Sequence, residues 1–372
     1  MKTSMIRQIE SVPALMKMME PELRSTVKKF LHVTDIGKYR KIILTGCGDS
    51  LCSAMAARFA FMKYTDLETE VVTVMDLARV YEKKALTGNE DVMVVAVSNS
   101  GKVARIIELA KRIRMLGGFL VAVTGNETSG LYREAGAVIK MRIPAFDYAP
   151  GIRSYCGCLM ALFHLAIGIG EKTGTLSALH VNEICAEMKR IAEILPDYME
   201  NWEEKSFSYA KQLTDATSFE FIGAGVQYAS AWFGYAKALE TTGLPSSALN
   251  TEDWFHMNFF VRDVYRTASF LFVNEKEGGF SRAKELLQIA ENMGRPLLCI
   301  TDSNTLCAAE KIMTPNTERE ELNSLIQYLP ISMIMSYVGD LLGEAYFRDG
   351  KDNWAACVNC ATLTNSEEVI LP

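Results

Sequence analysis

The chain has 372 residues, of which 49% are hydrophobic, and a formal net charge of −6 at pH 7. This length is enough for two or three domains, and the mildly acidic balance argues against a nucleic-acid partner and favours a polar small molecule. Residues 1–30 lack the apolar core of a secretory signal, and the most apolar stretch, 155–170, is too short to span a bilayer. We therefore expect a cytoplasmic protein with no membrane segment.

Strands and helices alternate through the first half of the chain. After a helix at about 13–33, strands are predicted at 41–45, 70–74, 92–97, 119–123 and 137–141. Helices are predicted after the first strand, from Asp76, at 102–116, near 129–135 and at 154–170. Such alternation is typical of a parallel, doubly wound sheet whose apolar strands are covered by helices on both faces. We predict one α/β domain over residues 1–176, which includes the leading helix.

A charged helical segment at 178–213, expected to break at Pro196, forms a connector over residues 177–215. Beyond it, strands are predicted at 218–222, near 268–273 and at 296–300, with helices at 228–242 and 323–347. The tail is polar and irregular from Gly350. Residues 216–372 are the second predicted domain.

The two halves repeat each other at an offset of 177 residues. Gly46, Gly48, Ser53 and Ala54 fall on Gly223, Gly225, Ser230 and Ala231, and FLVAVTGN from Phe119 falls on PLLCITDS from Pro296. Two copies of one strand–glycine–helix unit in a common frame predict two tandem domains of the same fold, which are free to take different roles.

The cysteines and histidines do not form a convincing metal site. Nine cysteines are scattered, and neither the C-x-x-C of Cys357 and Cys360 nor the C-x-C of Cys156 and Cys158 has a second ligand pair. The chain has only four histidines. We expect reduced thiols, no metal and no organic cofactor.

Two polar loops follow predicted strands of the first domain. Ser98-Asn99-Ser100-Gly101 lies between a strand and a helix, and Ser50 follows the first strand. Strand carboxyl ends and helix N-termini in an open parallel sheet bind anions, so phosphate binding is favoured over N-capping alone. The first loop lacks the third glycine of a dinucleotide fingerprint, and no Walker lysine follows. The sequence therefore argues against a nicotinamide cofactor and favours a sugar phosphate.

These motifs resemble the double SIS (sugar isomerase) domain family, which includes the fructosamine-6-phosphate deglycases and the isomerase half of glucosamine-6-phosphate synthase. GCGDS is similar to the family's GCGTS loop, SNSGK to its SQSGE loop, and GIRS at 151–154 to its GVAS segment. The resemblance implies two flavodoxin-like SIS domains and a phosphorylated sugar or glycated amino acid as ligand. It also implies phosphate or substrate contacts from Cys47, Gly48, Asp49, Ser50, Ser98, Asn99, Ser100, Gly101 and Ser154.

The opening of the second domain, GAGVQYASAWFGYAKALE, also resembles the family and ends at Glu240, with His256 sixteen residues further on. In the family, the glutamate moves a proton between sugar C1 and C2, and the histidine opens the sugar ring, commonly from a neighbouring subunit of a homodimer. A carboxylate and an imidazole form an acid/base pair suited to this chemistry, and we expect both at one sheet edge. Asp253 is a candidate supporting residue.

Some residues depart from the family pattern. Met257-Asn258 replaces Gly-Pro after the histidine, and Asp49 and Val103 stand where threonines are expected. The tail at 359–370 has no lysine like that of the synthase, and no glutaminase domain is expected before Met1, which together favour the deglycases.

Three functions are therefore considered: a fructosamine-6-phosphate deglycase or aminosugar-phosphate deaminase, a hexose-phosphate aldose-ketose isomerase, and a non-catalytic phosphosugar-binding regulator. In the second copy, the charged segment Asn274–Glu277 replaces SNSG and would repel phosphate, while Glu240 replaces Lys63. We predict that the first copy holds the anion and that the second supplies the acid/base chemistry.

Overall fold

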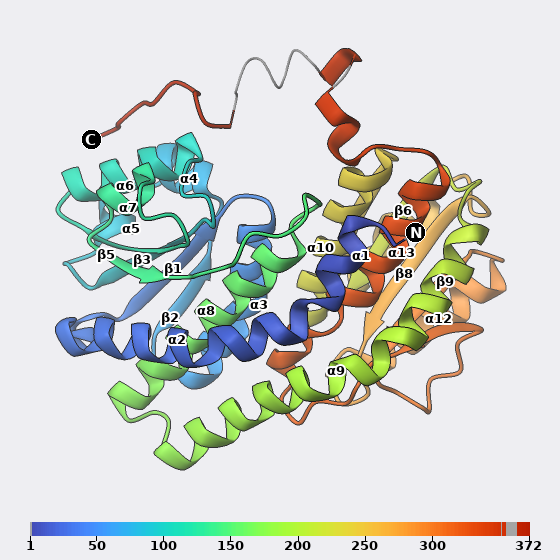
Figure 1. The fold of residues 1–372 in the computed structure, drawn as a ribbon, viewed down its shortest axis with the longest axis horizontal. Helices are drawn as coiled ribbons and strands as arrows, with labels where there is room; N and C mark the ends of the chain where they lie inside the picture. The colour runs from blue at the N-terminus through green and yellow to red at the C-terminus, as the bar shows by residue number, and fades with distance from the viewer. Residues whose placement is uncertain (1, 351, 355–362) are drawn as a thin grey trace. The chain divides into compact units, whose positions relative to one another are not determined.

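The structure is a computed structural model that describes residues 2–350, 352–354 and 363–372. Cys357 and Cys360 lie outside these ranges. The chain divides into two compact units, each built around its own sheet (Figure 1). One unit comprises Ala14–Ala145, Arg153–Ala186 and Gly350–Pro372, and the other Met1–Pro13, Phe146–Ile152 and Glu187–Asp349.

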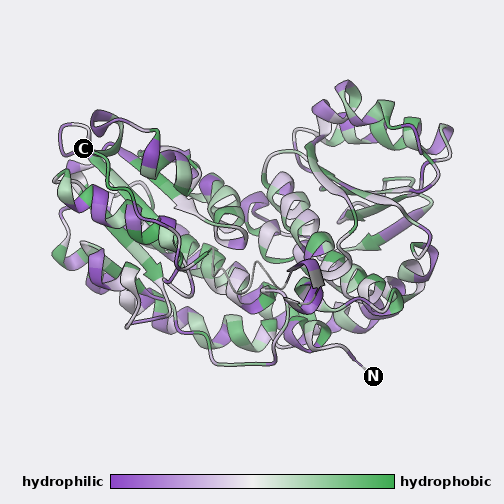
Figure 2. Cartoon of the chain, turned by 90° about the horizontal axis from the view of Figure 1, so that it is seen from above, coloured by the Kyte–Doolittle hydropathy of each residue, from purple (hydrophilic) through white to green (hydrophobic). Residues whose placement is uncertain are grey.

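The first unit contains a five-stranded parallel sheet in the order β2-β1-β3-β4-β5. Its strands are β1 (Lys41–Gly46), β2 (Glu68–Val71), β3 (Val92–Val97), β4 (Phe119–Thr124) and β5 (Ala137–Lys140). Its helices are α2 (Val12–Val33), η1 (Ile36–Lys38), α3 (Asp49–Tyr64), α4 (Val74–Arg79), α5 (Lys83–Thr87), α6 (Ala104–Met115), α7 (Gly130–Glu134) and α8 (Ile152–Thr173). The strands are apolar on both faces because helices cover both, as the hydropathy colouring shows (Figure 2).

The second unit repeats this architecture in the order β10-β9-β8-β6-β7, again wholly parallel. Its strands are β6 (Ser218–Gly223), β7 (Ser246–Asn250), β8 (Thr267–Val273), β9 (Leu297–Thr301) and β10 (Glu310–Met313). Its helices are α1 (Ser4–Glu10), α10 (Val226–Thr242), α11 (Thr251–His256), η2 (Asn258–Phe260), α12 (Phe280–Asn292), η3 (Glu320–Leu325), α13 (Tyr328–Leu341) and η4 (Tyr346–Gly350). The long helix α9 (Ala178–Gln212) contributes to both units, and η5 (Asp352–Trp354) lies near the end.

Numbered from the start of each copy, both sheets have the strand order 2-1-3-4-5 of a flavodoxin-like doubly wound fold, so the predicted fold class is confirmed. The repeat extends to backbone geometry. Gly48 (φ 54°, ψ −128°) and Gly225 (φ 56°, ψ −128°) are the N-caps of α3 and α10. L-residues rarely adopt a positive φ of this kind, so both copies depend on glycine for the same turn.

Several predicted elements differ from the structure. The helix α9 continues through Pro196, so the predicted break there is wrong. A proline removes only one hydrogen bond, and the buried residues on either side of it, such as Ile191 and Trp202, hold the helix in place. The predicted helix at 323–347 is instead η3 followed by α13, and the chain turns at Gly343 (φ 70°). The strand expected at 70–74 is β2, which ends at Val71.

Within the described ranges, α8 is long and apolar enough to cross a membrane, but 89% of its most apolar window is buried inside the protein. It is therefore a core helix of the first unit. The predicted domain limits at 176 and 215 remain predictions, although the tail residues 363–372 belong to the same compact unit as the first sheet.

Candidate active site

The two polar loops of the first sheet begin at adjacent positions. β1 and β3 are parallel neighbours, and Gly46 pairs in register with Val97. The loop that contains Cys47, Gly48, Asp49 and Ser50 therefore starts beside Ser98–Gly101, at the carboxyl edge of the sheet. Each loop leads into a helix N-terminus, that of α3 and that of α6. The structure thus brings the starts of the two polar loops side by side at this edge.

Hydrogen bonds within the loop fix the shape of Ser98–Gly101. The hydroxyl of Ser98, which is buried, accepts a bond from the Gly101 N–H at 3.1 Å, while the exposed Ser100 hydroxyl accepts from the Lys102 N–H at 3.3 Å. The Asn99 carbonyl accepts from the Gly125 N–H at 3.3 Å. Ser98 therefore shapes the turn, and Ser100 is better placed to meet a ligand.

Gly101 cannot be replaced without strain. Its φ is 61°, and an added Cβ would lie 2.2 Å from the Ser129 hydroxyl oxygen. Because both the backbone conformation and the packing require a missing side chain, this glycine allows the close approach of the loop to α7.

Ser50 and Ser154 lie at neighbouring helix ends. Burial raises the pKa of the Cys158 thiol to about 12, although hydrogen bonds with the Ser50 and Ser53 side chains oppose the shift. Cys158 is on α8, one turn after Ser154, so the first turn of α8 is close to the Ser50 loop. Burial also raises the pKa of Cys47 to about 11, so this cysteine is a neutral thiol at pH 7 and not an activated nucleophile.

The C-terminal segment occupies part of the same edge. The Leu363 carbonyl accepts the N–H of Ala104, the first residue of α6, at 2.8 Å. This contact satisfies one of the free N–H groups that a helix N-terminus offers. An anion bound here would therefore contact the loop Ser98–Lys102 rather than the first N–H of α6.

In the second unit, Glu240 lies in the last part of α10 and is ion-paired with a buried lysine. The Lys237 side chain is fully buried, with Nζ 2.5 Å from Glu240 Oε2 and 4.6 Å from the centre of the Phe233 ring. An ammonium group enclosed in this way holds the carboxylate in one orientation. Our sequence reasoning missed Lys237, although a lysine in the apolar run YAKALE, one turn before Glu240, was a usable signal.

His256 is the last residue of α11, and its side chain is 69% exposed. Its Nε2 lies 3.2 Å from Glu252 Oε1, and Glu252 in turn accepts hydrogen bonds from Arg282. Asp253 is exposed, and its backbone carbonyl accepts the N–H of Met257. Glu252, rather than the candidate Asp253, therefore contacts the His256 ring.

The helices that carry Glu240 and His256 cover opposite faces of the second sheet. Phe221 faces α10, where an added Cβ on Gly234 would lie 2.6 Å from its ring. The next residue, Ile222, points to the other face and packs in a cluster with Trp254 of α11. Among the described side chains, His256 makes its polar contact with Glu252 and none with Glu240.

A buried polar network fixes the segment around His256. Glu220 is 2% exposed and accepts hydrogen bonds from Trp254 Nε1 (3.1 Å), Asn258 Nδ2 (2.9 Å) and Arg295 Nη1 (3.0 Å). Trp254 and Asn258 each lie two residues from His256, so the network positions this residue. The signal in the sequence was a glutamate in the middle of an apolar strand, SFEFIG, which sequence reasoning had not used.

Comparison with known proteins identifies the first copy. Residues 35–167 match the family model described as the SIS domain. Residues 35–167 are a SIS domain. The predicted resemblance is therefore confirmed.

A relative of this SIS-domain protein is the glutamine–fructose-6-phosphate aminotransferase (isomerizing) of Caldanaerobacter subterraneus subsp. tengcongensis. The two are 25% identical over 214 residues, which are 58% of this chain and 34% of the relative. The chain thus spans about a third of the length of that relative.

Solved structures share the fold across both copies. The C-terminal domain of glucosamine-fructose-6-phosphate aminotransferase from Francisella tularensis superposes with a TM-score of 0.79 at 15% sequence identity. The superposition covers 93% of this chain and 98% of the Francisella chain. Tagatose-6-phosphate ketose/aldose isomerase from Escherichia coli has a TM-score of 0.72 at 15% identity, with coverages of 100% and 97%.

The loop of the second copy that corresponds to SNSG of the SIS domain has a different chemistry. Burial raises the pKa of the Glu277 carboxyl to about 8; Glu320 and Asp302 raise it further, and a hydrogen bond from the Asn274 N–H opposes the shift. At pH 7 this carboxyl is therefore mostly protonated. Buried amides fill the space nearby, with Asn274 Oδ1 accepting from Gln227 at 2.9 Å.

The described part of this SIS-domain protein contains no group of three or more His, Cys, Asp or Glu side chains that could hold a metal ion.

Proposed function

We propose that this SIS-domain protein is a phosphosugar-processing enzyme, specifically a fructosamine-6-phosphate deglycase or a closely related aminosugar-phosphate deaminase. The observation that carries the proposal is the adjacency of the Ser50 and Ser98–Gly101 loops at the carboxyl edge of the first sheet. Hydroxyls and helix N-termini at such an edge suit a phosphate group. We keep the expectation that the protein acts in the cytoplasm and needs no metal or organic cofactor.

In this proposal, the phosphate is bound by Ser50, Ser100 and Ser154 together with backbone N–H groups of the Ser98–Lys102 loop. Ser98 and Gly101 fix the loop, since one is buried and bonded to the other. Cys47, Gly48, Asp49 and Asn99 complete the lining as residues of the same two loops.

Glu240 would act as the proton shuttle. Its carboxylate takes a proton from C1 of the open-chain ketosamine and returns it to C2, which converts the ketosamine into an imine. Water then adds to the imine carbon, the C–N bond breaks, and an aldose phosphate and a free amine leave. The Lys237 ammonium, held 2.5 Å from Glu240, would stabilise the negative charge that develops as C1 loses its proton.

His256 would assist ring opening in the site of a second copy. It is exposed, and it lies on the face of its sheet opposite to the helix that carries Glu240. These positions support a homodimer in which each copy supplies its histidine to the other, as the family resemblance implies.

A coupled assay that follows glucose 6-phosphate and free amine from phosphorylated fructosamines tests the proposal. We expect Glu240→Gln to lower kcat by at least about a hundredfold while binding of the phosphosugar is retained. Glu200→Gln, an exposed change on α9, is the matched control and should keep full activity. A fully active Glu240→Gln enzyme contradicts the assigned role.

A second candidate is an aldose-ketose isomerase acting on a hexose phosphate. The Glu240–Lys237 pair favours it because a carbon-bound proton shuttle is all that isomerisation requires. Interconversion of hexose phosphates without release of amine would identify this activity. Tight phosphosugar binding without turnover of any phosphorylated ketose or fructosamine would instead support a regulatory protein.

A further inference from the structure

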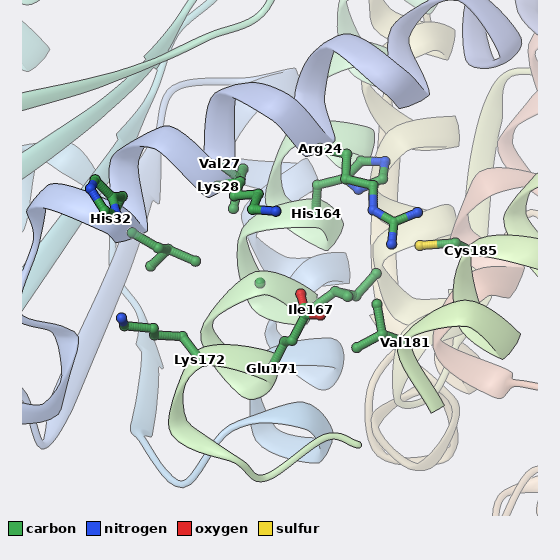
Figure 3. A pocket seen from close by; sticks show the side chains of 12 residues that line it. Arg24, Val27, Lys28, His32, His164, Ile167, Glu171, Lys172, Val181 and Cys185 are labelled. Carbon is green, nitrogen blue, oxygen red and sulfur yellow. The ribbon is translucent and has the colours of Figure 1, made fainter. Parts of the chain in front are cut away.

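A cavity of about 410 Å³ lies in the first unit, among three helices, and none of its lining residues belongs to the proposed active site (Figure 3). On each helix, the residues that line the cavity recur every three or four positions, so they lie on one face of the helix. The lining comprises Arg24, Val27, Lys28, Leu31 and His32 of α2, His164, Ile167, Gly168, Glu171 and Lys172 of α8, and Val181 and Cys185 of α9. Its volume lies within the range of small-molecule sites.

Gly168 makes this arrangement possible. An added Cβ there would lie 2.6 Å from Val27 Cγ1 and 2.9 Å from Leu31 Cδ1. The glycine therefore lets α2 approach α8 closely beside the cavity.

The floor of the cavity contains a polar atom that has no partner. His164 is 3% exposed, and its Nε2 makes no hydrogen bond within the described structure. Most buried polar groups in proteins form a hydrogen bond, because leaving one unpaired is unfavourable. The imidazole of His164 is thus a buried group of the cavity wall, and its NMR signal would report on a ligand bound there.

The rim carries positive charge that is not used elsewhere. Arg24, Lys28 and Lys172 are exposed, and among the residues that the structure describes their side chains form no hydrogen bond or ion pair. Glu171 is the one carboxylate in the lining. Figure 3 shows Arg24 and Lys28 on α2 facing Glu171 and Cys185 across the space. Three cations against one carboxylate favour an anion.

Apolar side chains make up most of the rest of the wall. Val27, Leu31, Ile167 and Val181 are each at least 95% buried, and they line one continuous part of the cavity. This surface would accept an apolar group rather than a fully hydrated inorganic ion.

We propose that this cavity binds a small organic anion, with its head group held by Arg24 and Lys28 beside His164 and its apolar body against Val27, Leu31 and Ile167. The site is separate from the serine loops, because none of its residues belongs to them. The proposal does not depend on the proposed function.

Binding of phenyl phosphate, followed through the imidazole NMR signals of histidine-labelled protein, tests this site. The chain has only four histidines, so the His164 signal can be assigned with the His164→Phe variant. We expect phenyl phosphate to shift the His164 signal with a Kd on the order of 0.1–1 mM, and benzyl alcohol and inorganic phosphate each to bind at least about tenfold more weakly.

The double variant Arg24→Gln/Lys28→Gln should weaken phenyl phosphate binding by about tenfold or more. Lys17→Gln/Lys29→Gln is the matched control, because it removes the same charge from exposed positions of α2 that do not line the cavity, and it should bind normally. Both pairs are on the surface, so folding is retained. An unmoved His164 signal, equal binding of benzyl alcohol, equal binding of inorganic phosphate, or equal weakening by both double variants would each overturn the proposal.

Discussion

Glu277 makes the stability of the second unit depend on pH. Burial, first of all, raises the pKa of its carboxyl to about 8, so the folded state keeps a proton that the unfolded state loses near pH 4.5. Between these values the unfolded state binds fewer protons, and this group therefore lowers stability as pH rises. We expect Glu277→Gln to be more stable than the unsubstituted protein at pH 8 by a few kcal/mol, and the difference to vanish near pH 4.5.

Urea unfolding at pH values from 4.5 to 8 measures this effect. The glutamine keeps an oxygen that can accept the Asn274 N–H, which in the present structure bonds to Glu277 Oε2 at 3.2 Å. Glu200→Gln controls for the loss of an exposed carboxylate and should show no such trend. A difference between Glu277→Gln and the parent that stays constant over this pH range would show that Glu277 ionises normally.

At the scale of elements, Glu108 ties the C-terminal segment to α6. It is fully buried, accepts hydrogen bonds from Arg79 at 2.9 Å and from the Val369 N–H at 2.8 Å, and is ion-paired with Arg105. Burial opposes its ionisation, but these partners hold the pKa of Glu108 below its usual value. We expect Glu108→Gln to destabilise the protein by about 1–3 kcal/mol, because a neutral amide weakens the hydrogen bonds from Arg79 and Arg105.

Hydrogen exchange of the peptide at 363–371 gives the local readout. In Glu108→Gln this peptide should exchange much faster, while β1 and β3 remain protected. Lys111→Gln, which removes a more exposed ion pair to Glu368 on the same segment, is the control and should change stability by less than about 1 kcal/mol. Equal exchange of the tail in both variants would mean that Glu108 does not anchor it.

The elements also show which parts of the fold can be read from sequence. Strands buried on both faces have apolar runs with clear ends, so 92–97 was predicted to the residue and 41–45 and 119–123 each ended one residue early. The strands β7 and β10 were missed because they are short edge strands, and only partly buried. Pro196 was misread as a helix end because the contacts that hold α9 together are long-range.

In the candidate site, the two serine loops could be predicted from local motifs, because each is a short polar segment between an apolar strand and a helix. Lys237 and Glu220 were missed because their role depends on burial and on partners distant in sequence, such as Arg295. The face of the sheet that each helix covers is likewise set by tertiary packing. For this reason the sequence could not show that the helices of Glu240 and His256 cover opposite faces of the second sheet.

For the whole molecule, this separation leads to a test of the proposed homodimer. If each site combines Glu240 of one copy with His256 of another, two inactive variants should restore activity when mixed. Glu240→Gln and His256→Ala, refolded together or co-expressed, would form mixed dimers in half of the population, and one of the two sites in each mixed dimer would be intact. We therefore expect about a quarter of the activity of the unsubstituted enzyme, from a dimer with two-fold symmetry.

Light scattering must first show that the protein is dimeric, and each variant alone must be inactive in the coupled assay. As a control, a mixture of Glu240→Gln with the double variant Glu240→Gln/His256→Ala has no copy that can supply an intact glutamate, so it should stay inactive. If each site used residues of a single copy, the complementing mixture would also stay inactive, since every copy in it lacks one of the two groups. Recovery of activity would thus mean that the exposed His256 of one copy acts in the active site of the other. Only the dimer, and no single copy, would then contain a complete active site.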